Sequence, residues 1–215
     1  HLYGIPYNIS VVSFYYNPYS MEASGLPPVP PRTWDDIISL GQRVTRDTSG
    51  DGVPDIWAMD ISSAGGFFME AWLGQGGTTT VNEARTEMVV NSPAGVRTYE
   101  FLQELIHVHG VARYGGFPWD TLTSGTVGWF LRSSADSRAL LEMSRDKGVP
   151  LSLAPLPCNV QCYVPIGGAA FYAVDTGTQA ERDATYKLLS FLGQPDNVAR
   201  YAAASGYLAT RRSAL

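Results

Sequence analysis

The stretch Pro165-Ile-Gly-Gly-Ala-Ala-Phe-Tyr-Ala-Val174 places two adjacent glycines at the entry to an apolar run with the composition of a strand. Glycine there lets the backbone approach another body closely and leaves its N–H groups uncovered. A predicted helix then ends at Gly206 and presents Tyr207, an aromatic residue with a polar tip. Together Gly167, Gly168 and Tyr207 predict a small-molecule rim without an evident catalytic group, which favours binding over catalysis.

The composition predicts a folded protein with a largely uncharged surface. Of 215 residues, 45% are hydrophobic and only 16% are charged, with 22 glycines, 14 prolines and 12 tyrosines. Such a chain can bury a sizeable core in one large or two small domains. The net charge of −5, with no basic cluster beyond Arg211-Arg212, argues against nucleic acid or an anionic membrane as partner. No apolar run reaches the roughly 18–20 residues of a membrane span.

Strands and helices are mixed along the chain, which predicts an α/β or α+β fold. Thr33 and Asp36 have the spacing of a capping box, and Ser92-Pro93 marks a strong helix start. Strands are expected over 7–16, 56–59, 127–131, 150–156 and 171–174. Helices are expected over 33–47, 65–73, from 92, over 118–123, from 133 or 134 to 147, over 179–192 and over 196–204.

Two cysteines, Cys158 and Cys162, lie four residues apart. A zinc site would need two further ligands, and none lies near in the sequence. A small-loop disulfide in an oxidising compartment and two free thiols at the edge of a core both fit the pattern.

The loop after the first predicted helix has the spacing of a calcium-binding loop. Ligand positions 1, 3, 5, 7 and 9 fall, in order, on Asp47, Ser49, Asp51, the carbonyl of Val53 and Asp55. Ala58 stands where the bidentate glutamate is expected, so the predicted site is open or weak. The alternative is a turn rich in aspartate and glycine. A calcium-stabilised adhesion module is a third functional class that this loop would support.

An ordered series of short segments, covering nearly the whole chain, resembles the family 1 extracellular solute-binding proteins of bacterial ABC importers. The segments are Tyr3-Gly-Ile-Pro-Tyr-Asn-Ile-Ser10, Phe14-Tyr-Tyr-Asn17, Ala23-Ser-Gly-Leu26, Pro30-Pro-Arg-Thr-Trp-Asp-Asp36, Gly167-Gly-Ala169, Phe191-Leu-Gly-Gln-Pro195 and Ser205-Gly-Tyr-Leu208.

The resemblance implies an α/β fold of the periplasmic-binding-protein type II, in which two lobes close by a hinge on a ligand held between them. This chain would form one nearly complete lobe and part of the other, with further residues before His1 and after Leu215. Residues 1–10 would be a crossing strand from the N-terminal lobe, and residues 11–160 the second lobe. Residues 161–204 would return to the N-terminal lobe, and residues 205–215 would cross back to the second.

The function that the resemblance implies is capture of a sugar or oligosaccharide for delivery to a membrane permease. Such a receptor is a periplasmic or extracellular monomer, with a lipoprotein anchor as an open possibility, and is not an enzyme. One alternative is a glycerol-3-phosphate or phosphodiester binder of the same family, although the downstream arginine of those binders is absent here. The other is a carbohydrate-active hydrolase, which needs two carboxylates roughly 5–10 Å apart. Its candidates by type are Glu70, Glu83, Glu87, Glu100, Glu104 and Asp120.

Four further residues are candidate ligand contacts. Ser10 lies on the crossing strand, and its alternative is an ordinary strand residue. Trp72 offers an indole for stacking on a sugar ring, and its alternative is a core position. Ser133 and Ser134 open a helix and suit a ligand oxygen, although simple N-capping explains them equally. The alternatives for the glycine pair and for Tyr207 are close strand packing and helix-end packing.

Overall fold

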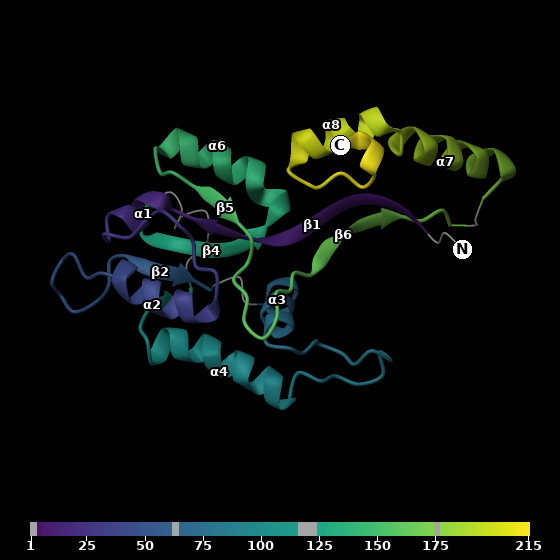
Figure 1. The fold of residues 1–215 in the computed structure, drawn as a ribbon. Coiled ribbons are helices and arrows are strands. Elements are labelled where there is room, and N and C mark those ends of the chain that lie inside the picture. The colour runs from purple at the N-terminus through teal and green to yellow at the C-terminus, as the bar shows by residue number, and fades with distance from the viewer. Residues whose placement is uncertain (1–3, 62–64, 116–123, 175–176) are drawn as a thin grey trace. The chain divides into compact units, whose positions relative to one another are not determined.

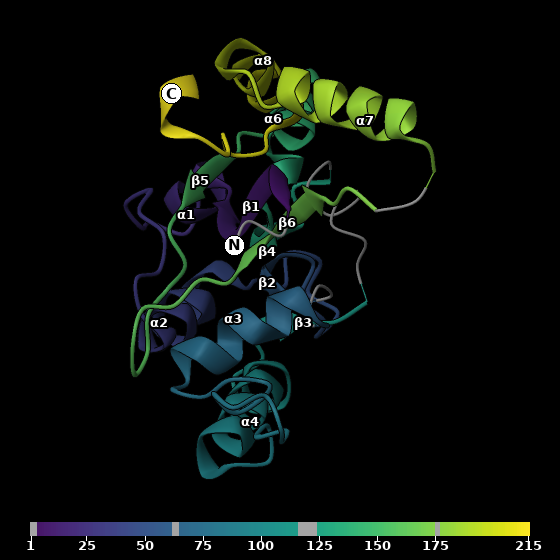
Figure 2. The ribbon, with the colours of Figure 1, turned by 90° about the vertical axis from the view of Figure 1, so that its right-hand side faces the viewer.

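A computed structural model describes residues 4–61, 65–115, 124–174 and 177–215, shown as ribbons in Figures 1 and 2. The chain divides into two compact units. Unit 1 comprises residues 1–11, 133–138 and 166–215, and unit 2 comprises residues 12–132 and 139–165. In chain order the described elements are β1 (Ile5–Tyr16), α1 (Pro18–Glu22), α2 (Trp34–Val44), β2 (Trp57–Asp60), α3 (Phe67–Gln75), α4 (Pro93–His107), β3 (Ala112–Arg113), β4 (Val127–Ser133), η1 (Ser134–Asp136), α6 (Ser137–Lys147), β5 (Ser152–Ala154), β6 (Ile166–Phe171), α7 (Gln179–Leu192), α8 (Pro195–Ser205) and η2 (Arg212–Ala214).

Unit 2 is built on a sheet of strand order β3-β2-β4-β1-β5, to which β1 contributes its second half. β2 pairs in parallel with both β3 and β4, while β1 pairs antiparallel with β5. Because successive side chains of a strand point to opposite faces, each strand can feed two apolar layers. The sheet is therefore covered on both faces.

The two layers follow from alternation along β1 and β4. Phe14, Trp129 and Leu131 belong to the main core, which also takes the apolar faces of α2, α3 and α4. Tyr15 and Phe130 stack at 5.5 Å and point to the other face, where they pack against Leu140 of α6. Figure 1 shows α2 and α4 on one side of this sheet and α6 on the other.

Helix starts in unit 2 are set by the caps that the sequence predicts. Thr33 Oγ1 accepts the N–H of Asp36, and the Asp36 carboxylate accepts the N–H of Thr33, so the capping box before α2 is complete. Ser92 Oγ accepts the N–H of Gly95 before Pro93 opens α4. These bonds satisfy N–H groups that have no partner within the helix.

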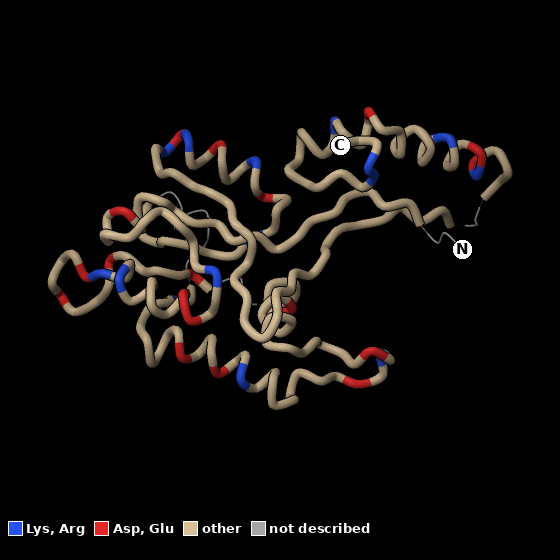
Figure 3. Tube along the Cα trace, in the orientation of Figure 1, with Lys and Arg blue, Asp and Glu red and all other residues tan. Residues whose placement is uncertain are grey.

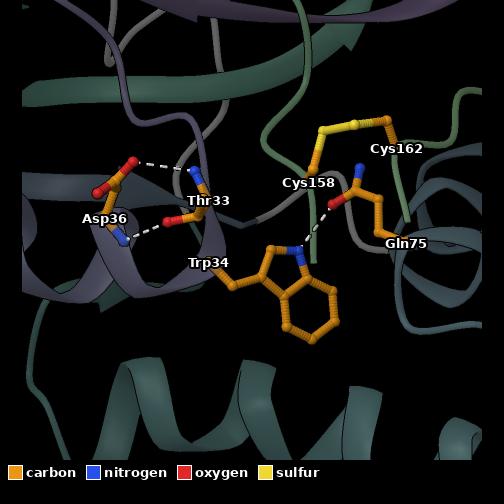
Figure 4. Close-up of a disulfide and its surroundings, with 6 residues drawn as sticks. All are labelled: Thr33, Trp34, Asp36, Gln75, Cys158 and Cys162. Carbon is orange, nitrogen blue, oxygen red and sulfur yellow. Dashed lines mark hydrogen bonds between the residues drawn. A yellow bond between two sulfur atoms is a disulfide. The ribbon is translucent and has the colours of Figure 1, made fainter. Parts of the chain in front are cut away.

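Cys158 and Cys162 form a disulfide, so the free-thiol alternative is wrong. The bridged loop is fixed at both sides: Cys158 exchanges backbone bonds with Arg32 and Trp34, and Gln161 Nε2 donates to the Gly74 carbonyl at 2.7 Å. Figure 4 shows the disulfide beside the Trp34 indole, whose Nε1 donates to Gln75 Oε1 at 2.7 Å. The loop thus ties the end of α3 to the start of α2.

Unit 1 consists of the first half of β1 paired antiparallel with β6, together with α7, α8 and the short η1 and η2. Thr178 and Glu181 form a capping box before α7, and Gly206 ends α8 with φ +82°. Residues 205–215 belong to this unit, because Leu208 N donates to the Ile9 carbonyl and Arg211 binds the Gly193 carbonyl. The expected crossing of this tail to the second lobe stays a prediction.

One expected strand differs from the structure, and one expected helix falls outside the residues that it describes. The strand expected over 171–174 instead spans Ile166–Phe171, because its backbone pairs with β1 from Val11 back to Ile5. The helix expected over 118–123 lies outside the described residues. Among the residues described, no helix combines the length and apolar character needed to cross a bilayer.

Candidate functional site

The carboxyl ends of β2, β3 and β4 form one edge of the unit 2 sheet. These strands are parallel, with Asp60 opposite both Arg113 of β3 and Phe130 of β4. In open α/β sheets, ligands bind outside the carboxyl ends of the parallel strands, where the connecting loops leave a crevice. The side chains at this edge are therefore the first candidates for solute contact in unit 2.

An ion pair joins the last residues of β2 and β3 at this edge. Arg113 Nε lies 3.2 Å from Asp60 Oδ2, and the Asp60 side chain is only 1% exposed, against 27% for Arg113. A buried carboxylate needs such a partner because leaving water is costly for a charge. The pair fixes two polar groups at the strand ends.

An arginine lies over an aromatic ring at the β4 part of the edge. The Arg132 guanidinium carbon is 5.8 Å from the centroid of Phe68, in the first turn of α3. Gly66 precedes this helix with φ +51° and no side-chain cap. The contact shows that the start of α3 lies beside the end of β4, although the two are far apart in the sequence.

In unit 1 the backbone pairing of β1 with β6 brings three sequence candidates together. Ser10 is paired with Gly167, and Ile9 with Gly168, while Leu208 bridges to Ile9 from the segment that carries Tyr207. Gly168 has φ +140°, and a Cβ there would collide with the Asn8 carbonyl oxygen. Close strand packing therefore explains this glycine, and ligand contact at the glycine pair stays a prediction.

Tyr207 belongs to an aromatic cluster within unit 1. Its ring stacks on Tyr201 at 6.0 Å, and Tyr201 contacts Tyr7 at 4.7 Å. The pKa of Tyr7 is raised, chiefly by its hydrogen bond with Tyr201 and to a smaller extent by burial. Asn8 Nδ2 donates to the Tyr201 hydroxyl at 3.4 Å, while the buried Asn8 Oδ1 has no hydrogen-bond partner. The cluster holds Tyr207 in place by its ring faces.

Ser133 and Ser134 have local partners in unit 1. Ser133 is the N-cap of η1, its Oγ accepting the N–H of Ala135 at 3.2 Å. Ser134 is 7% exposed, and its Oγ accepts the N–H of Val11 at 3.1 Å. The capping alternative therefore holds for Ser133, whereas Ser134 is bound to the backbone of β1. For both serines, a further contact with ligand oxygen stays a prediction. Ser10 is 5% exposed, and its contact with a ligand also stays a prediction.

Trp72 does not offer a stacking face, so the prediction of a sugar platform there is wrong. Its side chain is 1% exposed and packs in the unit 2 core, with Trp34 at 5.7 Å and Phe101 at 6.1 Å between ring centroids. The second half of α3 is buried all round from Ala71 to Gln75. A helix with this pattern has no face that sequence can assign to solvent.

The loop expected to bind calcium uses its carboxylates to order its own backbone. Asp47 accepts the N–H groups of Gly50 and Gly52, and Asp55 accepts the N–H groups of Thr48 and Ser49. These bonds lower the pKa of both carboxyl groups, for Asp47 chiefly through Gly52 and for Asp55 chiefly through the Thr48 hydroxyl. Within the described residues no group of three or more His, Cys, Asp and Glu is arranged to hold a metal ion. The turn interpretation is supported, and calcium stays a prediction.

Sequence reasoning missed the side chains at the unit 2 edge. Acidic and basic residues are interspersed along the chain (Figure 3), so charge patterning does not single out Arg113 or Arg132. The available signal was position, since Asp60 and Arg132 each directly follow a predicted strand. Which strands are neighbours, and therefore which ends meet, comes only from the structure.

The fold and the candidate sites define a class of protein. It is an α/β protein of two units, with polar groups at the carboxyl ends of the unit 2 strands and on the β1–β6 pair of unit 1. The model of the family described as "Bacterial extracellular solute-binding protein" matches residues 1–215. The chain therefore belongs to this family, as the sequence resemblance predicted.

Curated relatives include the sn-glycerol-3-phosphate-binding periplasmic protein UgpB of Escherichia coli strain K12. It is 24% identical over 226 residues, covering 100% of this chain and 50% of the relative. The chain thus spans about half the length of the curated relatives it matches.

Solved structures give the same fold. UgpB from Mycobacterium tuberculosis in complex with glycerophosphocholine has a TM-score of 0.80 at 22% identity, covering 99% of this chain and 52% of that one. The GacH receptor of Streptomyces glaucescens, solved unliganded and with acarbose, has a TM-score of 0.78 at 19% identity, covering 98% of this chain and 53% of that one. The predicted fold class, that of two-lobed periplasmic solute-binding proteins, is confirmed at the level of fold.

Proposed function

We propose that the protein is the extracytoplasmic substrate-binding component of an ABC importer, which captures a sugar or oligosaccharide and delivers it to a membrane permease. The observation that carries the proposal is the match of the solute-binding family along all 215 residues. The relatives named above are binding proteins, and the GacH receptor binds acarbose. A monomeric, periplasmic or extracellular receptor, with or without a lipid anchor, fits this role.

The chemistry at the two candidate surfaces supports a polyhydroxylated solute. Sugar hydroxyls need donors and acceptors, and their C–H faces pack on aromatic rings. Unit 1 supplies Tyr207 on its supporting ring Tyr201, and unit 2 supplies Phe68 and the strand-end charges. With Trp72 in the core, these rings replace it as the proposed apolar contacts.

A second candidate ligand is a glycerophosphate ester. It is favoured by the curated relative that binds sn-glycerol 3-phosphate and by the M. tuberculosis complex with glycerophosphocholine.

A hydrolase is the rival class, and Asp120, one of its candidate carboxylates, lies outside the described residues. Incubation with chromogenic glycosides separates binding from hydrolysis, since a receptor releases no chromophore.

Isothermal titration calorimetry of the intact protein tests the proposal, with maltotriose, acarbose, glycerol 3-phosphate and glycerophosphocholine as probes. We expect saturable binding of at least one probe. Tyr207→Ala should weaken that binding at least tenfold, a loss of about 1.4 kcal/mol. Tyr19→Ala is the matched control, because Tyr19 is 62% exposed and belongs to α1 of unit 2. Binding of no probe, or equal loss in both variants, would contradict the proposal.

A further inference from the structure

We propose that an open groove of unit 2, beside the carboxyl ends of β2 and β3, binds a further sugar ring of a neutral oligosaccharide. The inference rests on the proposed function and narrows its substrate class to sugars of several rings. The groove has a volume of about 460 Å³, within the range of about 300–1,000 Å³ that is typical of small-molecule sites. Its walls come from α3, α4 and the residues that follow β2 and β3.

The groove continues from the strand-end edge described above. Ile61 and Tyr114 line it, and they directly follow Asp60 and Arg113, the last residues of β2 and β3. The two segments are held side by side, because the Ile61 N–H donates to the Arg113 carbonyl at 3.0 Å. A solute bound at this edge, where open α/β sheets take their ligands, can therefore extend into the groove.

One stripe of α4 forms a long wall of the groove. The stripe comprises Tyr99, Leu102, Gln103, Ile106 and His107. Their spacing of three and four residues places these side chains on one face of the helix. Leu102 is buried, whereas Tyr99, Gln103 and His107 are exposed, so this wall has an apolar base and a polar rim.

Two exposed tyrosines give the groove the chemistry that a sugar ring needs. Tyr114 is 70% exposed and Tyr99 is 46% exposed. A tyrosine ring offers its face to the C–H groups of a sugar, and its hydroxyl can exchange a hydrogen bond with a sugar oxygen. Within the described chain, the side chains of Tyr99, Gln103 and Tyr114 take part in no hydrogen bond or ion pair. These groups are therefore available to a solute.

The charge of the lining favours a neutral occupant. No Lys, Arg, Asp or Glu is among the described residues that line the groove. A charged group that leaves water needs a partner of opposite charge, whereas a hydroxyl needs only a hydrogen bond. The groove therefore suits an uncharged sugar ring better than a phosphate ester.

Calorimetry on the intact protein tests the inference with maltose and maltohexaose, which differ in their number of rings. We expect the wild type to bind maltohexaose at least tenfold more tightly than maltose. Tyr114→Ala should remove most of this gain while maltose affinity changes less than twofold. Tyr114→Phe keeps the ring and loses the hydroxyl, so it should retain most of the gain. Tyr19→Ala is the control, since Tyr19 is 62% exposed and lies on α1, outside the groove.

Hydroxyl-radical footprinting of the wild type supplies a second measurement that does not depend on a variant. Maltohexaose should slow the oxidation of Tyr114, and maltose should not. The oxidation of Tyr19 should be the same with either sugar. Saturating maltohexaose that leaves Tyr114 unprotected would show that the groove takes a different occupant, such as a protein partner, and would overturn the inference.

The outcomes separate this inference from the proposed function. Equal wild-type affinity for maltose and maltohexaose overturns the role of the groove and leaves the receptor role intact. Binding of glycerophosphocholine but of no sugar does the same. Binding of no sugar and of no glycerophosphate probe overturns both. A gain that persists in Tyr114→Ala, or an equal loss for the short and the long sugar, overturns the inference alone.

Discussion

The two units differ in what stabilises each of them internally. Unit 2 has a continuous core that includes fully buried Trp72, Trp129 and Phe14. In unit 1, the buried hydrophobic residues among those described are Leu189 and Val198 alone, whereas α7 leaves Tyr186, Leu188 and Phe191 more than half exposed. Unit 1 is instead organised by strand pairing, helix caps and one ring cluster.

The difference teaches where each unit is sensitive. Removing core volume affects unit 2, because packed interiors lose both transfer energy and contacts when atoms are deleted. Distorting the backbone affects unit 1, because its register depends on a few tight approaches such as the one at Gly168. Hydrogen exchange read separately for residues of each unit can distinguish these two kinds of damage.

Trp72→Ala should have the largest effect on stability. Deleting a buried tryptophan costs about 3–5 kcal/mol, because a cavity is left among Trp34, Phe101 and their neighbours. Urea unfolding gives the change in the free energy of unfolding, and amide hydrogen exchange should become faster in unit 2. Phe191→Ala in unit 1 is the control, because its ring is 55% exposed and should change stability by less than about 0.5 kcal/mol. Equal losses in the two variants would refute the contrast.

Much of unit 2 could be predicted from sequence because its signals are local. The capping box at Thr33 and the Ser92-Pro93 start placed α2 and α4 at their observed beginnings. The burial of Trp72 could not be predicted, because residues 71–75 of its helix are buried on every side and only tertiary neighbours decide their exposure. The pair of Arg132 and Phe68 joins residues from distant segments, and no spacing rule relates them.

Gly168→Ala should have the next largest effect, and in unit 1. The residue would be held at φ +140° with its methyl group against the Asn8 carbonyl, a strain of about 1–3 kcal/mol. We expect faster exchange along β1 and β6 with little change in the unit 2 core. Gly110→Ala is the control: it also has positive φ, +61°, but nothing within 4 Å of its added Cβ. A Gly168 variant no less stable than the Gly110 variant would contradict the close-packing account.

Removing the disulfide should have an effect of similar size, but in unit 2. For so short a loop the chain-entropy model gives about 2 kcal/mol, and the bonds of Gln161 to the end of α3 would be weakened as well. Cys158→Ser with Cys162→Ser should therefore lower Tm, and a dithiol reductant should shift the wild type by the same amount. A reductant-induced shift that persists in the double variant would show that the disulfide is not its cause.

The smallest expected effect is the pH dependence of the Asp47–Asp55 loop. Hydrogen bonds depress the pKa of both carboxyl groups, chiefly from the Gly52 backbone N–H for Asp47 and from the Thr48 hydroxyl for Asp55. Their contribution to stability is therefore fully present above the ordinary aspartate pKa and is lost as pH falls through the lower folded values. Below about pH 4, Tm of the wild type should therefore approach that of Asp47→Asn with Asp55→Asn. Both carboxyl groups are exposed, so the difference in Tm between the two proteins at pH 7 should be modest. A gap between the two proteins that widens on acidification would contradict this origin.

The same pair of proteins tests the predicted calcium site at pH 7. If calcium binds, millimolar calcium should raise Tm of the wild type and a chelator should reverse the rise, because a ligand that binds only the folded state stabilises it. The double variant, lacking the carboxylates at ligand positions 1 and 9, should not respond. If the loop is only a turn, its carboxylates are already satisfied by backbone donors, and neither calcium nor chelator should move Tm in either protein.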